Sequence, residues 1–186
     1  MAYLSITHSS SLPRPMYRWR LVLGMGVLCG LLHTTVLRWV DFGLWQPDLF
    51  SLLALYFSLY ANRQGRYLPC LILGLIRDFM SLGLLGSYAV LYSLLHKVAS
   101  KARLRLDPDN LANTLLMAFL GTFLVNFGYH MMLAISGDGI GWTRATMRCL
   151  MIASATAPLA PFAFALANHA LGRLGVSRIA GGYMNI

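Results

Sequence analysis

The chain has 186 residues, of which 58% are hydrophobic and only 11% are charged. Ordinary soluble domains are about 45–50% apolar, and a soluble chain this short cannot bury so much apolar surface. Disorder is excluded by the same composition, because disordered chains are polar. The net charge of +9 is better explained by membrane orientation and anionic lipid than by nucleic acid. The composition therefore predicts an integral membrane protein that does not bind nucleic acid.

Apolar segments separated by short polar loops predict an all-α fold. A polar, basic cytoplasmic tail, 1–20, precedes the membrane domain, 21–172, and a second cytoplasmic tail, 173–186, follows it. The first apolar segment is longer than the core of a signal peptide and no typical cleavage site follows it, so we expect a retained anchor. Six transmembrane helices are predicted, over residues of about 21–37, 47–62, 67–82, 84–100, 109–136 and 144–172.

The segment 67–95 admits two readings, one long helix or two short helices with a turn near Gly83. With two helices, eleven basic residues lie on one side of the membrane and four on the other. The larger group is Arg14, Arg18, Arg20, Arg63, Arg66, Lys97, Lys101, Arg103, Arg105, Arg173 and Arg178. The smaller group is Arg38, Arg77, Arg144 and Arg148. Because basic residues concentrate on the cytoplasmic side, we expect six spans with both termini in the cytoplasm.

Asp78 is the main candidate for a functional polar residue within the membrane. A carboxylate at the centre of a membrane helix costs about 2.5–3.5 kcal/mol on insertion scales, so it needs a partner. Gly74, Asp78 and Ser81 share one stripe of the predicted helix, and Arg77 is adjacent. Two readings remain open: a structural polar anchor near the outer interface, or a contact with a partner or ligand.

Other polar and small residues have simpler readings. Asp48 follows Pro47 at the start of a predicted helix, where a carboxylate caps free backbone amides. Lys97, Lys101 and Arg105 recur every fourth residue, and with Arg103 they form a cytoplasmic patch for anionic lipid or for a partner. Glycine and other small residues, at positions such as 26, 30, 74 and 86, allow close helix packing inside the protein or against another membrane protein.

Signatures of catalysis are missing from the sequence. It contains no G-x-S-x-G, H-E-x-x-H or P-loop motif. The three cysteines are scattered, and the histidines lack acidic or cysteine companions at ligand spacing. We therefore expect neither an enzyme nor a cofactor nor a metal.

Two segments carry a resemblance to a known family. The first, 47–56, reads P-D-L-F-S-L-L-A-L-Y. The second combines Gly74, Asp78 and Ser81 with a later L-G-x-x-A-x-x-Y motif that contains Gly86 and Tyr92. The ordered pair of segments, with six spans, resembles the bacterial rod shape-determining protein MreD. Arg77 departs from the family pattern, in which an apolar residue is more usual before the aspartate.

The resemblance implies a non-enzymatic scaffold of the cell-elongation complex in the bacterial inner membrane. Implied partners are an MreC-like single-span protein, the RodA glycosyltransferase, a class B penicillin-binding transpeptidase and the MreB filament. It also implies a fold like that of the S component of energy-coupling-factor transporters. The alternative function is therefore a solute-binding S component of a vitamin transporter. The sequence has few polar groups to hold a vitamin, which favours the scaffold.

Overall fold

The computed structural model describes residues 19–39, 46–60, 67–81, 83–107, 110–137 and 141–173. The predicted tails lie almost entirely outside these ranges. The prediction of an all-α protein is confirmed, since every regular element in the described part of the chain is helical. The elements are α1 (Trp19–Trp39), α2 (Leu49–Tyr60), α3 (Leu68–Met80), α4 (Ser87–Ala102), α5 (Leu111–Ile135), α6 (Trp142–Thr156), the short 3₁₀ helix η1 (Ala157–Leu159) and α7 (Ala160–Arg173).

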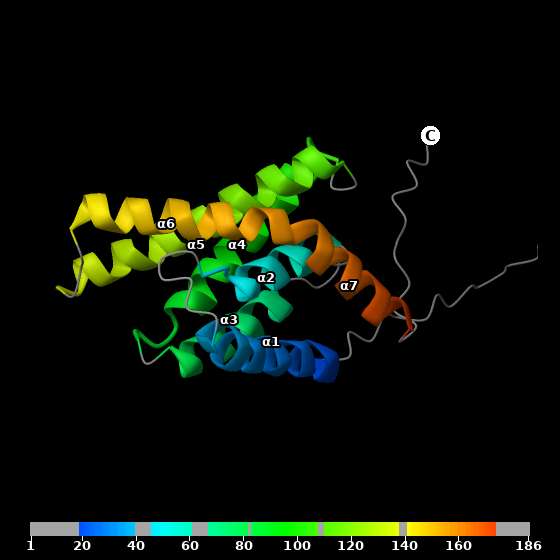
Figure 1. The fold of residues 1–186 in the computed structure, drawn as a ribbon, viewed down its shortest axis with the longest axis horizontal. Coiled ribbons are helices and arrows are strands. Elements are labelled where there is room, and N and C mark those ends of the chain that lie inside the picture. Colours follow the sequence, from blue (N-terminus) through cyan, green and yellow to red (C-terminus); the bar gives the residue numbers. More distant parts are fainter. Residues whose placement is uncertain are drawn as a thin grey trace, which may run out of the picture.

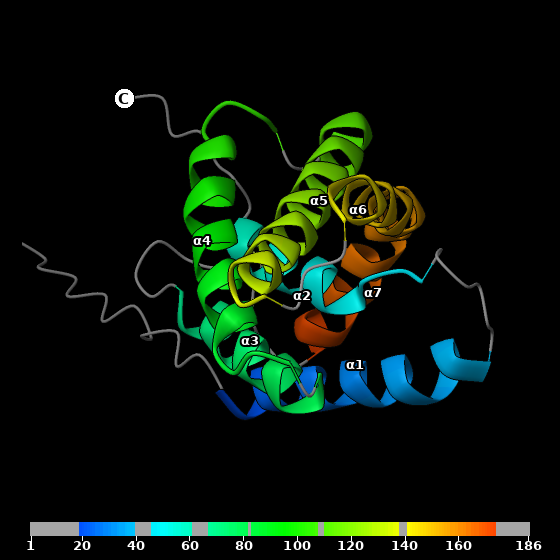
Figure 2. The ribbon, with the colours of Figure 1, turned by 90° about the vertical axis from the view of Figure 1, so that its left-hand side faces the viewer.

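Helix α2 forms the centre of the molecule (Figures 1 and 2). It packs against α1, α3, α4, α5 and α7, and nine of its twelve residues are buried. Twelve residues extend only about 18 Å, less than the hydrocarbon thickness of about 30 Å. A short helix that is apolar on all sides is stable here because other helices, rather than lipid, surround it.

The structure has two short helices, α3 and α4, in the segment 67–95, where the sequence admitted one or two helices and the charge distribution favoured two. Helix α3 ends at Met80 and α4 begins at Ser87. Gly86, directly before α4, has a φ of +90°, a conformation that residues with a Cβ rarely adopt. This glycine lets the chain reverse direction, so that α4 packs back against α3.

The α6–η1–α7 run is one apolar helical stretch with a bend near its middle, visible in Figure 1. Pro158 lies within η1 and Pro161 in the first turn of α7. Proline removes a backbone donor and clashes with the preceding turn, which explains the change to 3₁₀ geometry at this point.

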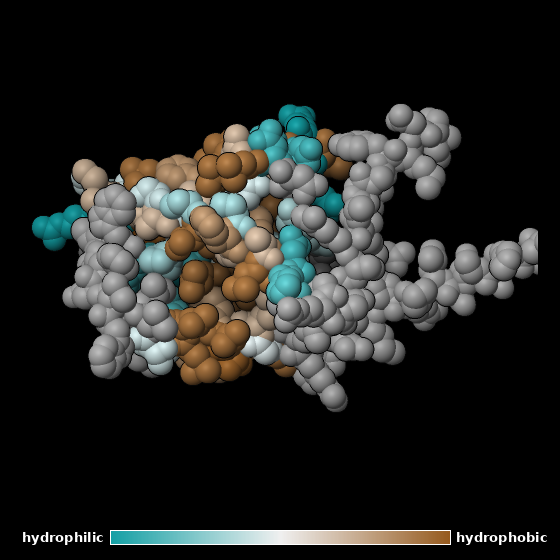
Figure 3. All heavy atoms as spheres, turned by 45° about the vertical axis from the view of Figure 1, so that its right-hand side comes forward, coloured by the Kyte–Doolittle hydropathy of each residue, from teal (hydrophilic) through white to brown (hydrophobic). Residues whose placement is uncertain are grey.

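Among the residues that the structure describes, two helical stretches are long and apolar enough to cross a membrane, Leu111–Ile135 and Trp142–His169. Shorter apolar helices cover Val22–Thr35 and Leu49–Tyr60. Many large apolar side chains are exposed. In Figure 3 hydrophobic residues extend across the middle of the visible face, and hydrophilic residues lie toward its ends. This distribution is compatible with a membrane environment around the middle of the protein.

Candidate functional site

Asp48 caps the start of the central helix. Its backbone carbonyl accepts the first helical hydrogen bond, from Leu52 N. Its side chain accepts from Ser51 N at 3.1 Å and from Ser51 Oγ at 2.6 Å. The sequence predicted this capping role, and the geometry agrees with it. The residue is also 2% exposed, so its charge needs compensation from within the protein.

Arg77 provides that compensation from α3. Its guanidinium forms an ion pair with Asp48 Oδ1 and donates a second hydrogen bond to the Tyr92 hydroxyl. The Arg77 Cζ atom lies 4.0 Å from the centre of the Tyr88 ring, within the range of a cation–π contact. Arg77 is therefore held by charge on one side and by aromatic rings of α4 on the other.

Two further helices complete the polar network around Asp48. Asn126 of α5 donates its Nδ2 hydrogen to Asp48 Oδ2 at 3.1 Å. Thr156 of α6 accepts a hydrogen bond on Oγ1 from Asp48 N at 2.9 Å. The carboxylate and backbone of one residue thus connect the start of α2 to α3, α5 and α6, while Tyr92 adds α4. We call these five residues, Asp48, Arg77, Tyr92, Asn126 and Thr156, the core polar network.

Asp78 has a different role from its neighbour Arg77. It is 2% exposed, and its two carboxylate oxygens accept the backbone amides of Tyr88 at 3.1 Å and Ala89 at 3.2 Å. These amides are free because they lie in the first turn of α4. Gly86, at the N-cap position, has no side chain to satisfy them. Asp78 therefore caps α4 from the neighbouring helix. The side-chain hydroxyl of Ser81 donates a long hydrogen bond of 3.5 Å to the Asp78 carbonyl.

Three of the four glycines predicted to allow close helix packing, at positions 26, 30 and 74, contact neighbours inside the protein. A Cβ on Gly74 would meet the backbone of Ala89, so α3 and α4 touch directly there. A Cβ on Gly26 would meet Leu73 and Ile76, and one on Gly30 would meet Met80. Gly86 serves the turn rather than a contact, since nothing lies within 4 Å of the position that a Cβ would occupy there.

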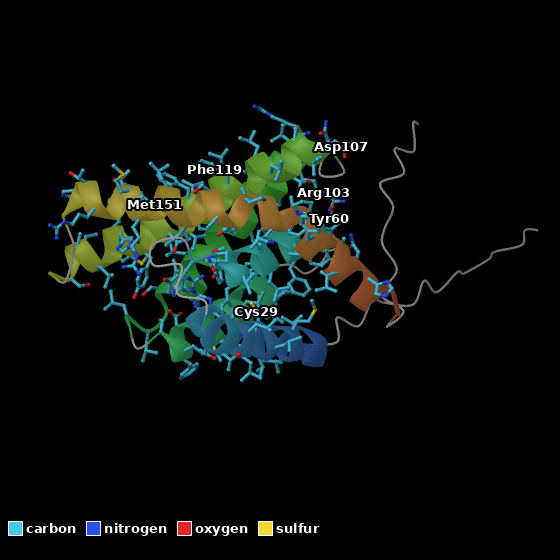
Figure 4. All side chains as sticks on the ribbon, in the orientation of Figure 1. Cys29, Tyr60, Arg103, Asp107, Phe119 and Met151 are labelled. Atoms are coloured by element: carbon cyan, nitrogen blue, oxygen red, sulfur yellow. The ribbon has the colours of Figure 1, made fainter. Side chains whose placement is uncertain are left out.

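The predicted basic patch lies at the end of α4 remote from the core polar network. Lys97, Lys101 and Arg105 are exposed, and Arg103 is half-buried. Figure 4 shows Arg103 and Asp107 at the end of the molecule where α4 terminates and α5 begins. The patch therefore begins about one and a half turns after Tyr92, the α4 residue of the core polar network, and continues away from it to the end of the helix.

A polar cavity of about 360 Å³ borders the core polar network. Its lining includes side chains from α1 and from α3 to α6. Those relevant to its chemistry are His33, Asp48, Arg77, Asn126, His130 and Arg148. Within the described residues no group of His, Cys, Asp or Glu is placed to hold a metal ion.

The ion pair between Asp48 and Arg77 was not predicted from the sequence. Asp48 was expected only to cap a helix, and Arg77 was considered only as a neighbour of Asp78. The two residues are 29 positions apart. A usable signal existed, because a charged residue in an apolar helix needs a partner. In the predicted topology, the start of the second span, with Asp48, and the end of the third, with Arg77, lie on the same side of the membrane. Tyr92, named only through the resemblance, is fully buried and bonded to Arg77.

The fold and the site together define an all-helical membrane-associated protein whose interior is organised by a polar network. A family model described as rod shape-determining protein MreD matches residues 14–168. The chain belongs to the MreD family, a family of shape-determining structural proteins. No curated protein and no solved structure matches the chain. The resemblance to the S-component fold therefore stays a prediction.

Proposed function

We propose that this protein is a non-enzymatic scaffold of the cell-elongation complex. In this role it supports peptidoglycan synthesis and rod shape by binding an MreC-like single-span protein in the inner membrane. The observation that carries the proposal is the family match over residues 14–168. The RodA glycosyltransferase, the class B transpeptidase and the MreB filament would belong to the same assembly.

The interior supports a scaffold role because it favours one fixed arrangement of helices. The core polar network joins the start of α2 to four other helices. Buried polar groups that are fully paired restrict a core to one packing arrangement. A partner that recognises helix surfaces needs such a fixed surface, since association in lipid depends on close contact.

The proposed orientation has six spans and both termini in the cytoplasm. The basic patch on α4 would face the cytoplasm, where anionic lipid attracts basic residues. The core polar network would lie toward the opposite side. The α5 helix and the α6–η1–α7 run would span the bilayer directly, whereas α2 and α3 would be held among protein neighbours.

We place the docking surface for the MreC-like helix on the side of the molecule formed by α1 to α4. The outer face of α4 offers a row of exposed apolar side chains at Val90, Leu94 and Val98. These positions are four residues apart and so lie along one face of the helix. The glycines of α1 and α3 at positions 26, 30 and 74 are already in contact with neighbours inside the protein, so the surface is formed by aliphatic side chains.

Copurification of the MreC-like protein tests this placement. Leu94→Trp changes the exposed face of α4, and Leu124→Trp makes the same change at a similarly exposed position of α5. We expect Leu94→Trp to reduce recovery of the partner several-fold, relative to the amount of protein in the membrane, while Leu124→Trp leaves recovery unchanged. Equal recovery from both variants would contradict the α4 surface. Recovery of transporter ATPase subunits without an MreC-like protein would contradict the scaffold and favour the S component.

A further inference from the structure

The polar cavity has an excess of positive charge in its lining. Arg77 and Asp48 form an ion pair and compensate one another. Arg148 of α6 also lines the cavity and is exposed, and it has no acidic partner among the residues that the structure describes. One uncompensated guanidinium in a cavity favours an anionic ligand.

Neutral hydrogen-bonding groups surround this charge. His33 and His130 line the cavity from α1 and α5. Their Nδ1 atoms are buried and have no hydrogen-bond partner within the described part of the chain. Tyr88 and Tyr129 add phenol groups to the lining. An imidazole, a phenol and a guanidinium can all donate a hydrogen bond, which is the requirement for holding several oxygens of one anion.

The position of the cavity points to a ligand at the membrane interface. Arg148 lies six residues after Trp142, the first residue of α6, which corresponds to about 9 Å along the helix axis. Tryptophan is enriched at the level of the lipid headgroups. The cavity is also at the end of the bundle remote from the basic patch of α4. Its volume of about 360 Å³ is at the lower end of the range for ligand pockets, which suits a headgroup rather than a large solute.

We propose that this cavity binds the phosphate group of an anionic lipid, with Arg148 at its entrance as the main contact and His33 and His130 as additional donors. Arg77 remains bound to Asp48. The positive charge available to the ligand is therefore that of Arg148, which lies outside the core polar network. A free phosphate ion would satisfy the same donors. This site is independent of the scaffold function, because it involves a different surface and no protein partner.

Lipid binding to the purified full-length protein tests the site. The delipidated protein in detergent is titrated with phosphatidylglycerol, with phosphatidylcholine or with inorganic phosphate, while its thermal stability is followed. A ligand that binds only the folded state stabilises it by RT ln(1 + [L]/Kd), so the unfolding temperature rises as the ligand concentration increases relative to the dissociation constant. We expect phosphatidylglycerol to raise the unfolding temperature more than phosphatidylcholine does. Arg148→Gln should weaken the apparent affinity about tenfold or more, as for the loss of one charge-assisted hydrogen bond.

Arg144→Gln is the matched control. Arg144 lies one turn before Arg148 on the same helix and is also exposed, but it does not line the cavity. We expect the Arg144→Gln variant to bind phosphatidylglycerol with the same affinity as the unmodified protein. Arg148→Lys should retain part of the affinity, because it keeps the charge and loses the planar fork. The unfolding temperatures without ligand report whether a variant is damaged, and native mass spectrometry measures retained lipid without relying on stability.

Each outcome decides the proposal. An Arg148-dependent response to phosphatidylglycerol alone supports a lipid headgroup, and an equal Arg148-dependent response to inorganic phosphate supports a free phosphate site. Equal lipid binding by the Arg148→Gln and Arg144→Gln variants, or no response to any of the three ligands, would overturn the site. None of these results depends on copurification of an MreC-like protein, so the two proposals can fail separately.

Discussion

Neighbouring charged residues on α3 perform separate tasks. Arg77 compensates Asp48 across the helix interface, whereas Asp78 caps α4 through the backbone amides of Tyr88 and Ala89. Two residues of opposite charge at adjacent positions suggest a local pair from sequence alone. In the structure they differ by about 100° around the helix and have different partners. The sequence made Asp78 the main candidate for a functional polar residue. The structure shows that this residue has a structural role as the cap of α4.

The ion pair between Asp48 and Arg77 should be cooperative in a double-mutant cycle. Arg77→Met leaves a buried carboxylate without its partner, which costs about 3–5 kcal/mol of unfolding free energy. Adding Asp48→Asn removes the uncompensated charge and retains an oxygen that can cap α2. We expect the double variant to unfold in detergent at a higher temperature than Arg77→Met alone. Strictly additive losses from the two single variants would show that the pair contributes little coupling.

The contact between α3 and α4 depends on one glycine and one carboxylate. Gly74, one turn before Asp78 on α3, brings the two helices together at Ala89, and Asp78 caps the backbone amides of Ala89 and its neighbour Tyr88. The two features support one another, since the cap requires the short helix separation that the glycine allows. By contrast, Gly24 on α1 has open space around it, so not every helical glycine in this chain marks a close contact.

Gly74→Ala and Gly24→Ala separate these two kinds of glycine. The first introduces a methyl group against the backbone of α4, and overpacking of this kind costs about 1–3 kcal/mol. The second places a methyl group in open space and gains up to about 1 kcal/mol from the higher helix propensity of alanine. We expect Gly74→Ala to lower the unfolding temperature in detergent and Gly24→Ala to leave it unchanged or raise it. A similar response in both variants would contradict direct contact between α3 and α4.

Across the whole molecule, features set by local sequence could be predicted, and those set by distant contacts could not. Apolar runs predict helices because their composition is local. The charge count favoured two helices with a turn near Gly83, and the structure has the positive-φ glycine of this turn at Gly86. The pairing of Asp48 with Arg77 and the use of Asn126 and Thr156 depend on which helices meet in three dimensions. The sequence gives no direct measure of that arrangement. The cavity also escaped prediction, because its lining comes from five separate helices and the segment before α2.

The two ends of the molecule should face opposite sides of the membrane. Leu104, after α4 and within the basic patch, is 75% exposed, and Gly141, before α6, is exposed with open space around it. A cysteine at either position is accessible, whereas Cys29, Cys70 and Cys149 are 7%, 0% and 0% exposed. The unmodified protein is therefore a suitable blank for labelling with a membrane-impermeant maleimide.

Because basic residues concentrate on the cytoplasmic side, we expect Gly141→Cys to react in spheroplasts and Leu104→Cys to react only after the membrane is disrupted. Reaction of both cysteines from the same side would contradict the six-span orientation, because an odd number of crossings must separate the end of α4 from the start of α6.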